Sequence, residues 1–197
     1  SWFLSHPHGD HIGALDKILH DRQGVTIDRI YHSGMPEFAL ATEPESVPLA
    51  HDFYDMLAAQ TETEVFDLQE TGGRFDVDGV AVKVLGVQNP EITTNLSNIS
   101  ANSSTNMYNN SSIIFRVWDD SKSFLFLGDA GKECGDKLMA AYPEYQDCDY
   151  LQMAHHGQSG CDEHFYKTVS FRACLWPTPT WVWDPAPEHK QIGRADV

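Results

Sequence analysis

The segment at positions 6–11, His-Pro-His-Gly-Asp-His, concentrates side chains that bind metal ions. It contains four ligand-type residues in six positions: His6, His8, Asp10 and His11. Neutral imidazole nitrogen and carboxylate oxygen are the ligands that Zn²⁺, Mn²⁺ and iron take in proteins. Three histidines and one aspartate so close together rarely arise by chance. The segment therefore predicts a metal site.

The residues on either side predict how this segment is held. Residues 1–5 read as a short apolar strand, and the apolar residues Ile12, Leu15, Ile18 and Leu19 have helical spacing. The four ligand-type residues then lie on a strand-to-helix turn, where alternate side chains can point into one cavity.

Two later segments place further ligand-type residues directly after predicted strands. Gly128-Asp129 follows the apolar run 124–127, and His155-His156-Gly157 follows the run 150–154. Each pair is weak evidence when taken alone. Because layered α/β sheets gather their ligands at strand ends, we expect these residues to meet the opening cluster.

The remaining pattern alternates strands with helices. Strands are predicted over 27–31, 64–67, 80–85, 113–118 and 171–175, and helices over 12–19, 46–58, 132–142 and 161–168. The Asn/Ser-rich stretch 95–112 is predicted to be a long mobile loop, and 177–197 an irregular tail. We expect a single α/β domain over residues 1–197, and a fragment that lacks N-terminal strands because it begins at Ser1.

Composition narrows the classes of partner. The 197 residues include 13 basic and 29 acidic side chains, a net charge of 13 − 29 = −16, which disfavours a broad duplex-binding face. No apolar run approaches the roughly 20 residues that span a bilayer. The four cysteines form no C-x-x-C pair and are expected to be buried free thiols. The compartment stays open, with a slight preference for the cytoplasm.

Histidines outside these segments are not predicted to bind metal. His32 and His164 are candidates for lining a pocket, whereas His20, His51 and His189 are expected to be solvated. Trp181 and Trp183 are expected to form a hydrophobic cover.

The combination of motifs resembles the metallo-β-lactamase-fold hydrolases. His6-x-His8-x-Asp10-His11 matches their signature, Asp129 their bridging aspartate, and His155-His156-Gly157 their last histidine motif. With residues 110–114, 124–129 and Ser159, the arrangement is most similar to ComEC-like competence hydrolase domains and is also similar to phosphorylcholine esterases. The resemblance covers residues 1 to about 176.

This resemblance implies a four-layer αββα sandwich with two zinc ions, with Mn²⁺ or iron as alternatives. His6 and His8 would hold the first ion, Asp10, His11 and His156 the second, and Asp129 would bridge them. His155 would contact substrate, although His155 and His156 could exchange roles. The chain has Asn109, Asn110 and Ser111 where many members place another histidine, so the first ion has fewer ligands and single-metal occupancy stays open.

The resemblance also implies a reaction. We expect a phosphoric ester hydrolase, in particular a phosphodiesterase, in which a metal-bound hydroxide attacks phosphorus. Asp10, Asp129 and His155 are the expected catalytic residues. The substrate would be a small phosphoester or single-stranded nucleic acid. The alternatives are hydrolysis of an amide or thioester, and a non-catalytic module that binds metal or nucleic acid.

Overall fold

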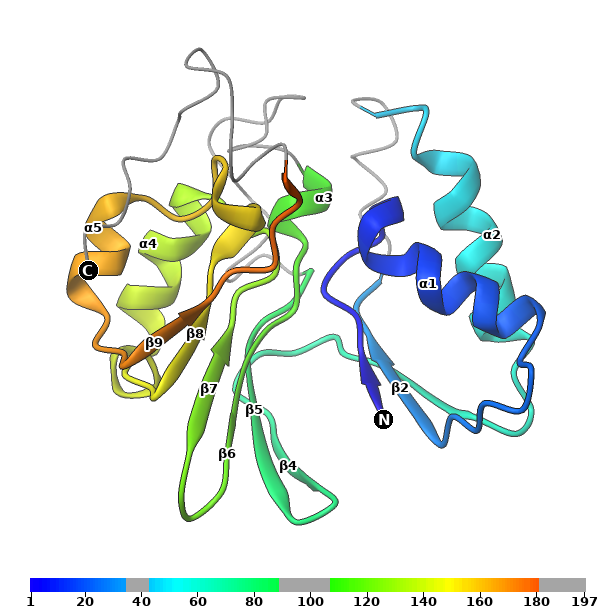
Figure 1. The fold of residues 1–197 in the computed structure, drawn as a ribbon, viewed down its shortest axis with the longest axis horizontal. Helices are drawn as coiled ribbons and strands as arrows, with labels where there is room; N and C mark the ends of the chain where they lie inside the picture. Colours follow the sequence, from blue (N-terminus) through cyan, green and yellow to red (C-terminus); the bar gives the residue numbers. More distant parts are fainter. Residues whose placement is uncertain (35–42, 89–106, 181–197) are drawn as a thin grey trace.

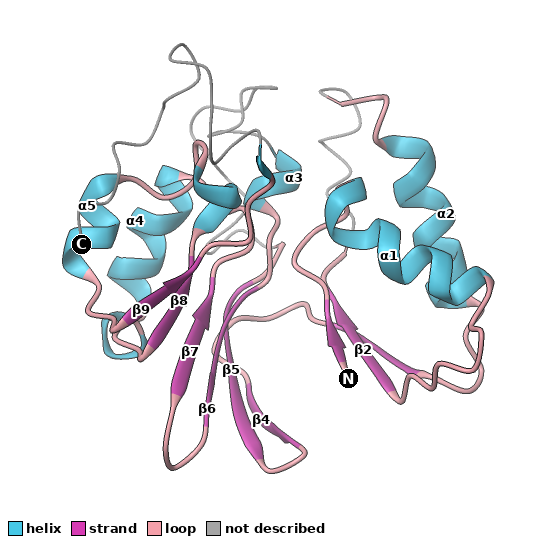
Figure 2. Cartoon of the chain, in the orientation of Figure 1, coloured by secondary structure: helices cyan, strands magenta, loops and turns pink. Residues whose placement is uncertain are grey.

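Two β-sheets form the middle of the molecule in a computed structural model of the chain (Figures 1 and 2). The structure describes residues 1–34, 43–88 and 107–180. The small sheet has the parallel order β1-β2-β3, and the large sheet has the order β4-β5-β6-β7-β8-β9. The strands are β1 (Trp2–Phe3), β2 (Arg29–His32), β3 (Glu64–Asp67), β4 (Arg74–Val77), β5 (Val80–Gly86), β6 (Ile114–Trp118), β7 (Ser123–Phe126), β8 (Tyr150–Gln152) and β9 (Ala173–Leu175).

Helices cover the outer face of each sheet. Helices α1 (Gly9–His20) and α2 (Val47–Ala58) connect the parallel strands of the small sheet, and α4 (Lys132–Ala141) and α5 (Glu163–Thr168) lie against the large one (Figure 1). Shorter turns are α3 (Met107–Asn110) and the 3-10 turns Pro143–Tyr145 and Ala154–Gly157. The layers run helix, sheet, sheet, helix, which confirms the predicted αββα sandwich.

Three apolar clusters hold the layers together. The face of α1 that carries Ile12, Leu15 and Leu19 is buried against the small sheet and α2, as its helical spacing predicts. Between the sheets, the Phe3 ring stacks on Tyr31 at 4.5 Å and on Phe115 at 4.9 Å. The third cluster packs α4 and α5 on the large sheet. Since both sheets are fixed to their helices and to each other, the ends of their strands are held in place.

Two contacts join strand ends at the edge where ligand-type residues were expected. The Ile113 N–H donates to the Ser5 carbonyl at 2.7 Å, which ties the end of β1 to the start of β6. The His155 N–H donates to the Gly128 carbonyl at 3.1 Å, which ties the turn after β8 to the turn after β7. The three ligand-bearing segments are therefore connected through the backbone.

The structure corrects three predictions about the elements. The strand over 1–5 is shorter, Trp2–Phe3. Strand β4 was not predicted; it pairs with β5 through a turn in which Asp78 has φ 52° and Gly79 φ 84°. The mobile loop predicted for 95–112 is wrong for its last residues, because 107–110 form α3 and residues 108–112 are buried. Residues 95–106 lie outside the described part.

Several smaller predictions can be compared as well. Cys134, Cys148 and Cys161 are buried free thiols as predicted, and Cys174 is a free thiol that is only partly buried. Among the histidines, His20 and His51 are exposed as expected, and His164 is exposed and lines neither of the two cavities described below. His189 and the tail from 181 onward, with Trp181 and Trp183, lie outside the described residues. In the described part of the chain, no helix combines the length and the apolar character needed to cross a bilayer.

Candidate metal centre

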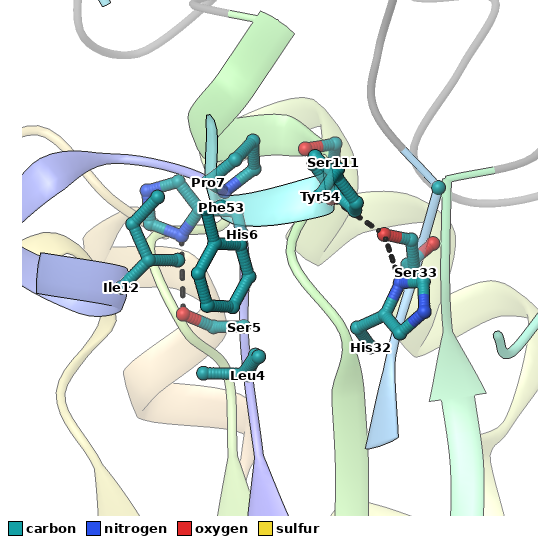
Figure 3. Close-up of a pocket in the computed structure, with 11 residues that line it drawn as sticks. Leu4, Ser5, His6, Pro7, Ile12, His32, Ser33, Phe53, Tyr54 and Ser111 are labelled. Carbon is teal, nitrogen blue, oxygen red and sulfur yellow. Dashed lines mark hydrogen bonds between the residues drawn. The ribbon is translucent and has the colours of Figure 1, made fainter. Parts of the chain in front are cut away.

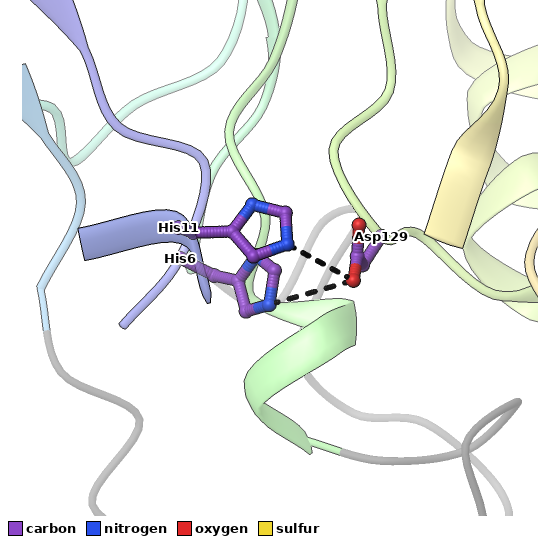
Figure 4. A group of neighbouring side chains, drawn as sticks. All are labelled: His6, His11 and Asp129. Carbon is purple, nitrogen blue, oxygen red and sulfur yellow. Dashed lines mark ion pairs between the residues drawn. The ribbon is translucent and has the colours of Figure 1, made fainter. Parts of the chain in front are cut away.

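Asp129 is the centre of the candidate site. Its Oδ2 atom lies 3.2 Å from His11 Nε2, 3.5 Å from His156 Nε2, 3.8 Å from His6 Nε2 and 3.9 Å from His155 Nε2. Figure 4 shows His6 and His11, which come from the first segment, directed at this carboxylate from the loop after β7. Four imidazoles from the two ends of the described chain thus meet at one carboxylate oxygen.

A second group of ligand-type atoms adjoins the first and shares His11 with it. The first group is His6, His11 and Asp129, and the second is Asp10, His11 and His156. In the second group, His156 Nε2 lies 3.0 Å from Asp10 Oδ2 and 3.3 Å from His11 Nε2. This juxtaposition supports His156, rather than His155, as the partner of Asp10 and His11.

His8 is near the centre but has a different neighbour. Its Nδ1 lies 2.9 Å from His6 Nε2, while its Nε2 lies 2.7 Å from Glu43 Oε2. The ring also stacks on Tyr108 of α3 at 5.0 Å. His8 is therefore absent from both groups among the described residues, and its contact with Glu43 was not predicted.

His155 approaches Asp129 but has different neighbours from His156. Its Nε2 is 3.4 Å from the Asn109 side-chain amide, and its buried Nδ1 has no hydrogen-bond partner among the described residues. The segment 109–112 passes beside it, where no additional histidine was found in the sequence. The structure thus puts the Asn109 side-chain amide, rather than an additional histidine, at this position.

Serine hydroxyls fix the orientation of the two histidines at the centre. His11 Nδ1 lies 2.8 Å from Ser5 Oγ, and His6 Nδ1 lies 3.2 Å from Ser112 Oγ. Ser112 Oγ already donates to the Asn109 carbonyl, so it accepts from His6 Nδ1. With the proton on Nδ1, the Nε2 lone pair faces Asp129 and is available to a metal ion.

Three polar side chains, two of them buried, hold the Asp129 loop. Ser112 Oγ accepts from the Asp129 N–H at 3.0 Å, and Asn110 Oδ1 accepts from the Gly131 N–H at 2.9 Å. Gln152 Oε1 accepts from the N–H groups of Leu127 and Gly128 at 2.9 and 2.8 Å. None of these supporting residues was predicted, because a single polar residue in a strand or loop carries no sequence signal of its partner.

The charge state of the centre follows from burial and contact. Burial and the neighbouring imidazoles hold the pKa of His6 well below its usual value, and burial lowers the pKa of His155. The Asp10 carboxylate raises the pKa of His156 to about 9, and in return the pKa of Asp10 is lowered. His6 and His155 are thus kept neutral, which is the form that binds metal, whereas His156 is protonated at neutral pH and a bound metal ion would replace its proton.

The donor set fits divalent metal ions. Asp129 is 2% exposed, and its Oδ1 has no hydrogen-bond partner among the described residues. A buried carboxylate oxygen without a donor is costly unless a cation or proton compensates it. His6, His11, His156, Asp10 and Asp129 together offer nitrogen and oxygen ligands of the kind that zinc binds.

A cavity of about 760 Å³ opens beside the centre, a volume typical of small-molecule sites. Asp10, His11 and His156 line one end, and apolar side chains of the large sheet, including Val82, Val117 and Phe126, line the rest. A second cavity of about 10 Å³ lies behind His6 and includes His32 (Figure 3). It has room for about one water molecule, so His32 does not contact substrate there.

A third group, Asp16, His20 and Asp52, lies on the helices of the small sheet, away from the centre. His20 Nδ1 is 3.6 Å from Asp16 Oδ1, and its Nε2 is 3.6 Å from Asp52 Oδ2. The imidazole therefore bridges two carboxylates with different nitrogens, which is the geometry of an ion-pair cluster on the surface.

Comparisons with known proteins agree with this architecture. A family model described as the metallo-beta-lactamase superfamily matches residues 2–159. No curated protein matches the chain.

Solved structures show distant likeness in fold. Zn²⁺-bound PqqB from Methylobacterium extorquens is 18% identical with a TM-score of 0.45, over 77% of this chain and 44% of that one. YhfI, a metallo-beta-lactamase fold protein from Bacillus subtilis, is 12% identical with a TM-score of 0.47, over 98% and 71%. A variant of the CmlA beta-hydroxylase is 14% identical with a TM-score of 0.46, over 84% and 28%. The chain thus spans less than half the length of PqqB.

Proposed function

The chain belongs to the metallo-beta-lactamase superfamily, most of whose members are metal-dependent hydrolases, and we propose that it hydrolyses phosphodiesters. The observation that carries this proposal is the meeting of four imidazoles at Asp129 Oδ2, at distances of 3.2–3.9 Å. A structural histidine cluster has no need of a buried carboxylate at its centre with one oxygen left unpaired.

Two adjacent ions would share these ligands. His6, with His8 beside it, would hold the first, and Asp10, His11 and His156 the second, with Asp129 between them. We propose zinc as the resident metal because imidazole and carboxylate suit it, with manganese or iron as alternatives. His8 would serve the first position with Nδ1, the nitrogen that lies 2.9 Å from His6 Nε2, while its Nε2–H donates to Glu43 Oε2 and orients the ring.

When bound, such ions lower the pKa of coordinated water and neutralise charge that develops on a phosphoryl group. The residues of the chain orient the reactants. Asp10 and His156, which line the large cavity, would meet a substrate bound there. His155 Nε2, 3.9 Å from Asp129 Oδ2, would, when it carries the proton, donate a hydrogen bond to a phosphoryl oxygen or protonate the leaving oxygen.

Two features favour a phosphodiester over an amide or thioester. The Asn109 amide and the His155 imidazole lie beside the Asp129 carboxylate, where a further metal ligand would otherwise stand. Both groups can donate hydrogen bonds to an anionic group. The motifs also resemble ComEC-like competence domains and phosphorylcholine esterases, which act on phosphate esters. The cavity of about 760 Å³ suits a small diester, and the net charge of −16 disfavours a long nucleic acid.

The test is turnover of bis-p-nitrophenyl phosphate after zinc or manganese is added, compared with a chromogenic lactam and a thioester. We expect turnover of the diester, and its loss in the isosteric variant Asp129→Asn. The control Asp120→Asn, on an exposed hairpin turn, should retain full activity. Turnover of the lactam or thioester alone would reverse the choice of substrate class.

Two further assays separate the remaining alternatives. Incubation with single-stranded DNA and Mn²⁺ gives shortened products if the chain is a nuclease, and leaves the strand intact if the substrate is a small diester. The second assay compares the wild type with the double variant Asp10→Ala/His11→Ala. A non-catalytic metal-binding module is favoured if both proteins are equally active, or if neither is active although metal is bound stoichiometrically.

A further inference from the structure

Three consecutive residues after β8 have left-handed backbone conformations. The φ angles are 47° at His155, 54° at His156 and 80° at Gly157. Only glycine adopts this region freely, and two neighbouring histidines in it are strained. Such strain persists only where the surrounding structure holds it, and it is frequent at functional sites.

The segment after β9 supplies that support. Trp176 Nε1–H donates to the His156 carbonyl at 2.6 Å, and His156 Nδ1–H donates to the Pro177 carbonyl at 2.8 Å. One bond fixes the backbone of His156 and the other fixes its ring. The pairing of Gln152 with Leu175, and the bond from the Met153 N–H to the Leu175 carbonyl at 2.8 Å, carry Trp176 to this place.

Gly157 completes the arrangement. A Cβ atom at this position would overlap the Trp176 indole, so the ring lies directly against the glycine backbone. The side chain of Trp176 therefore fills the space that the left-handed turn leaves open. Any larger residue at 157 would displace the indole and loosen its bond to His156.

We propose that Trp176 and Pro177 are positioning residues that present His156 to a metal ion, an inference that rests on the proposed metal centre. The Pro177 carbonyl accepts from His156 Nδ1–H, so Nε2, which faces Asp10 and Asp129, is the nitrogen that would bind a metal ion in place of its proton. The Trp176 indole holds the strained turn from which that ring projects. Both residues lie beyond residues 2–159, the part that the family model matches.

The test uses Trp176→Phe, which keeps an aromatic ring and removes the Nε1–H donor. The zinc dissociation constant is measured by competition with a chromogenic chelator, and we expect about 10–100-fold weaker binding, as for loss of a partner that orients a ligand. Trp118→Phe makes the same exchange at the end of β6 and is the matched control.

A second measurement separates positioning from general stability. In wild type, the ¹⁵N spectrum of the zinc-bound imidazole of His156 should report a proton on Nδ1. Trp176→Phe should broaden or shift this signal. The melting temperature of metal-free Trp176→Phe should fall no more than that of Trp118→Phe. If Trp176→Phe does not fold, Gly157→Ala replaces it, since the added Cβ pushes the indole away without removing it.

The outcomes are distinguishable. Zinc affinity within twofold of wild type in both Trp176→Phe and Gly157→Ala overturns the positioning role alone. Failure of the wild-type chain to bind zinc overturns the proposed metal centre, and the positioning role with it.

Discussion

The two halves of the candidate centre reach the same place by different means. Residues 6–11 supply four ligand-type side chains from one strand-to-helix turn, whereas Asp129, His155 and His156 come from two separate loops of the large sheet. The first set needs little beyond the local fold of β1 and α1. The second set depends on buried polar groups and on a strained backbone, so its geometry is more easily disturbed.

The largest expected effect compares the two aspartates. Asp129 is buried and contacts four imidazoles, whereas the side chain of Asp10 is 62% exposed and contacts two. We expect Asp129→Asn to weaken zinc binding at least about a hundredfold, and Asp10→Asn about tenfold. Zinc titration with a competing chelator measures both, and equal losses would contradict the central place of Asp129.

The next effect concerns the stability of the two supporting networks. Gln152→Leu leaves the N–H groups of Leu127 and Gly128 without their acceptor, so the free energy of unfolding should fall by about 2–3 kcal/mol. Ser5→Ala removes contacts only with imidazoles and should cost about 1 kcal/mol or less. Urea denaturation of the metal-free protein tests the order, and a larger loss in Ser5→Ala would reverse the comparison.

A smaller expected effect concerns the reactivity of cysteine thiols in the C-terminal half of the chain. Burial raises the pKa of Cys134 to about 12 and that of Cys161 well above its usual value, while Cys174 is only partly buried. At pH 8 we expect iodoacetamide to modify Cys174 at least about tenfold faster than Cys134 or Cys161. Mass spectrometry of timed samples measures the rates. If a zinc ion links the two halves of the candidate centre, adding zinc should slow the labelling of Cys134 and Cys161 further. Unchanged labelling rates on adding zinc would indicate that the two halves open independently.

The smallest expected effect lies on the helices of the small sheet. A hydrogen bond to the Asp16 backbone carbonyl, together with the carboxylates of Asp16 on α1 and Asp52 on α2, raises the pKa of His20 above its unfolded value of about 6.5. Its stabilising contribution is therefore present below pH 6.5 and is lost as the pH rises through the folded-state pKa. The melting temperature of His20→Gln should fall below that of wild type at pH 5.5 and match it at pH 9. A difference that grew with pH would contradict this assignment.

Local patterns were sufficient for most of the architecture. Apolar spacing predicted α1, α2, α4 and most strands of both sheets, since each pattern is set by residues a few positions apart. Strand β4 was missed because its four residues, Arg74–Val77, form only a short run between two turns, although polar and apolar residues alternate in it. The end of the Asn/Ser-rich stretch was also missed, because polar residues at 109–112 suggested solvent and gave no sign of their buried partners.

The ligand types, their attachment to strand ends and the layered fold can be predicted from the sequence, because they follow from side-chain chemistry and short-range periodicity. Packing of the folded chain sets the remaining contacts: His156 rather than His155 meets Asp10, His8 faces Glu43, and the centre is supported by Ser112, Gln152, Trp176 and Pro177. These relations are hydrogen bonds between segments far apart in the chain. They form only when the chain has packed, so the sequence of one segment does not identify the residues that it contacts.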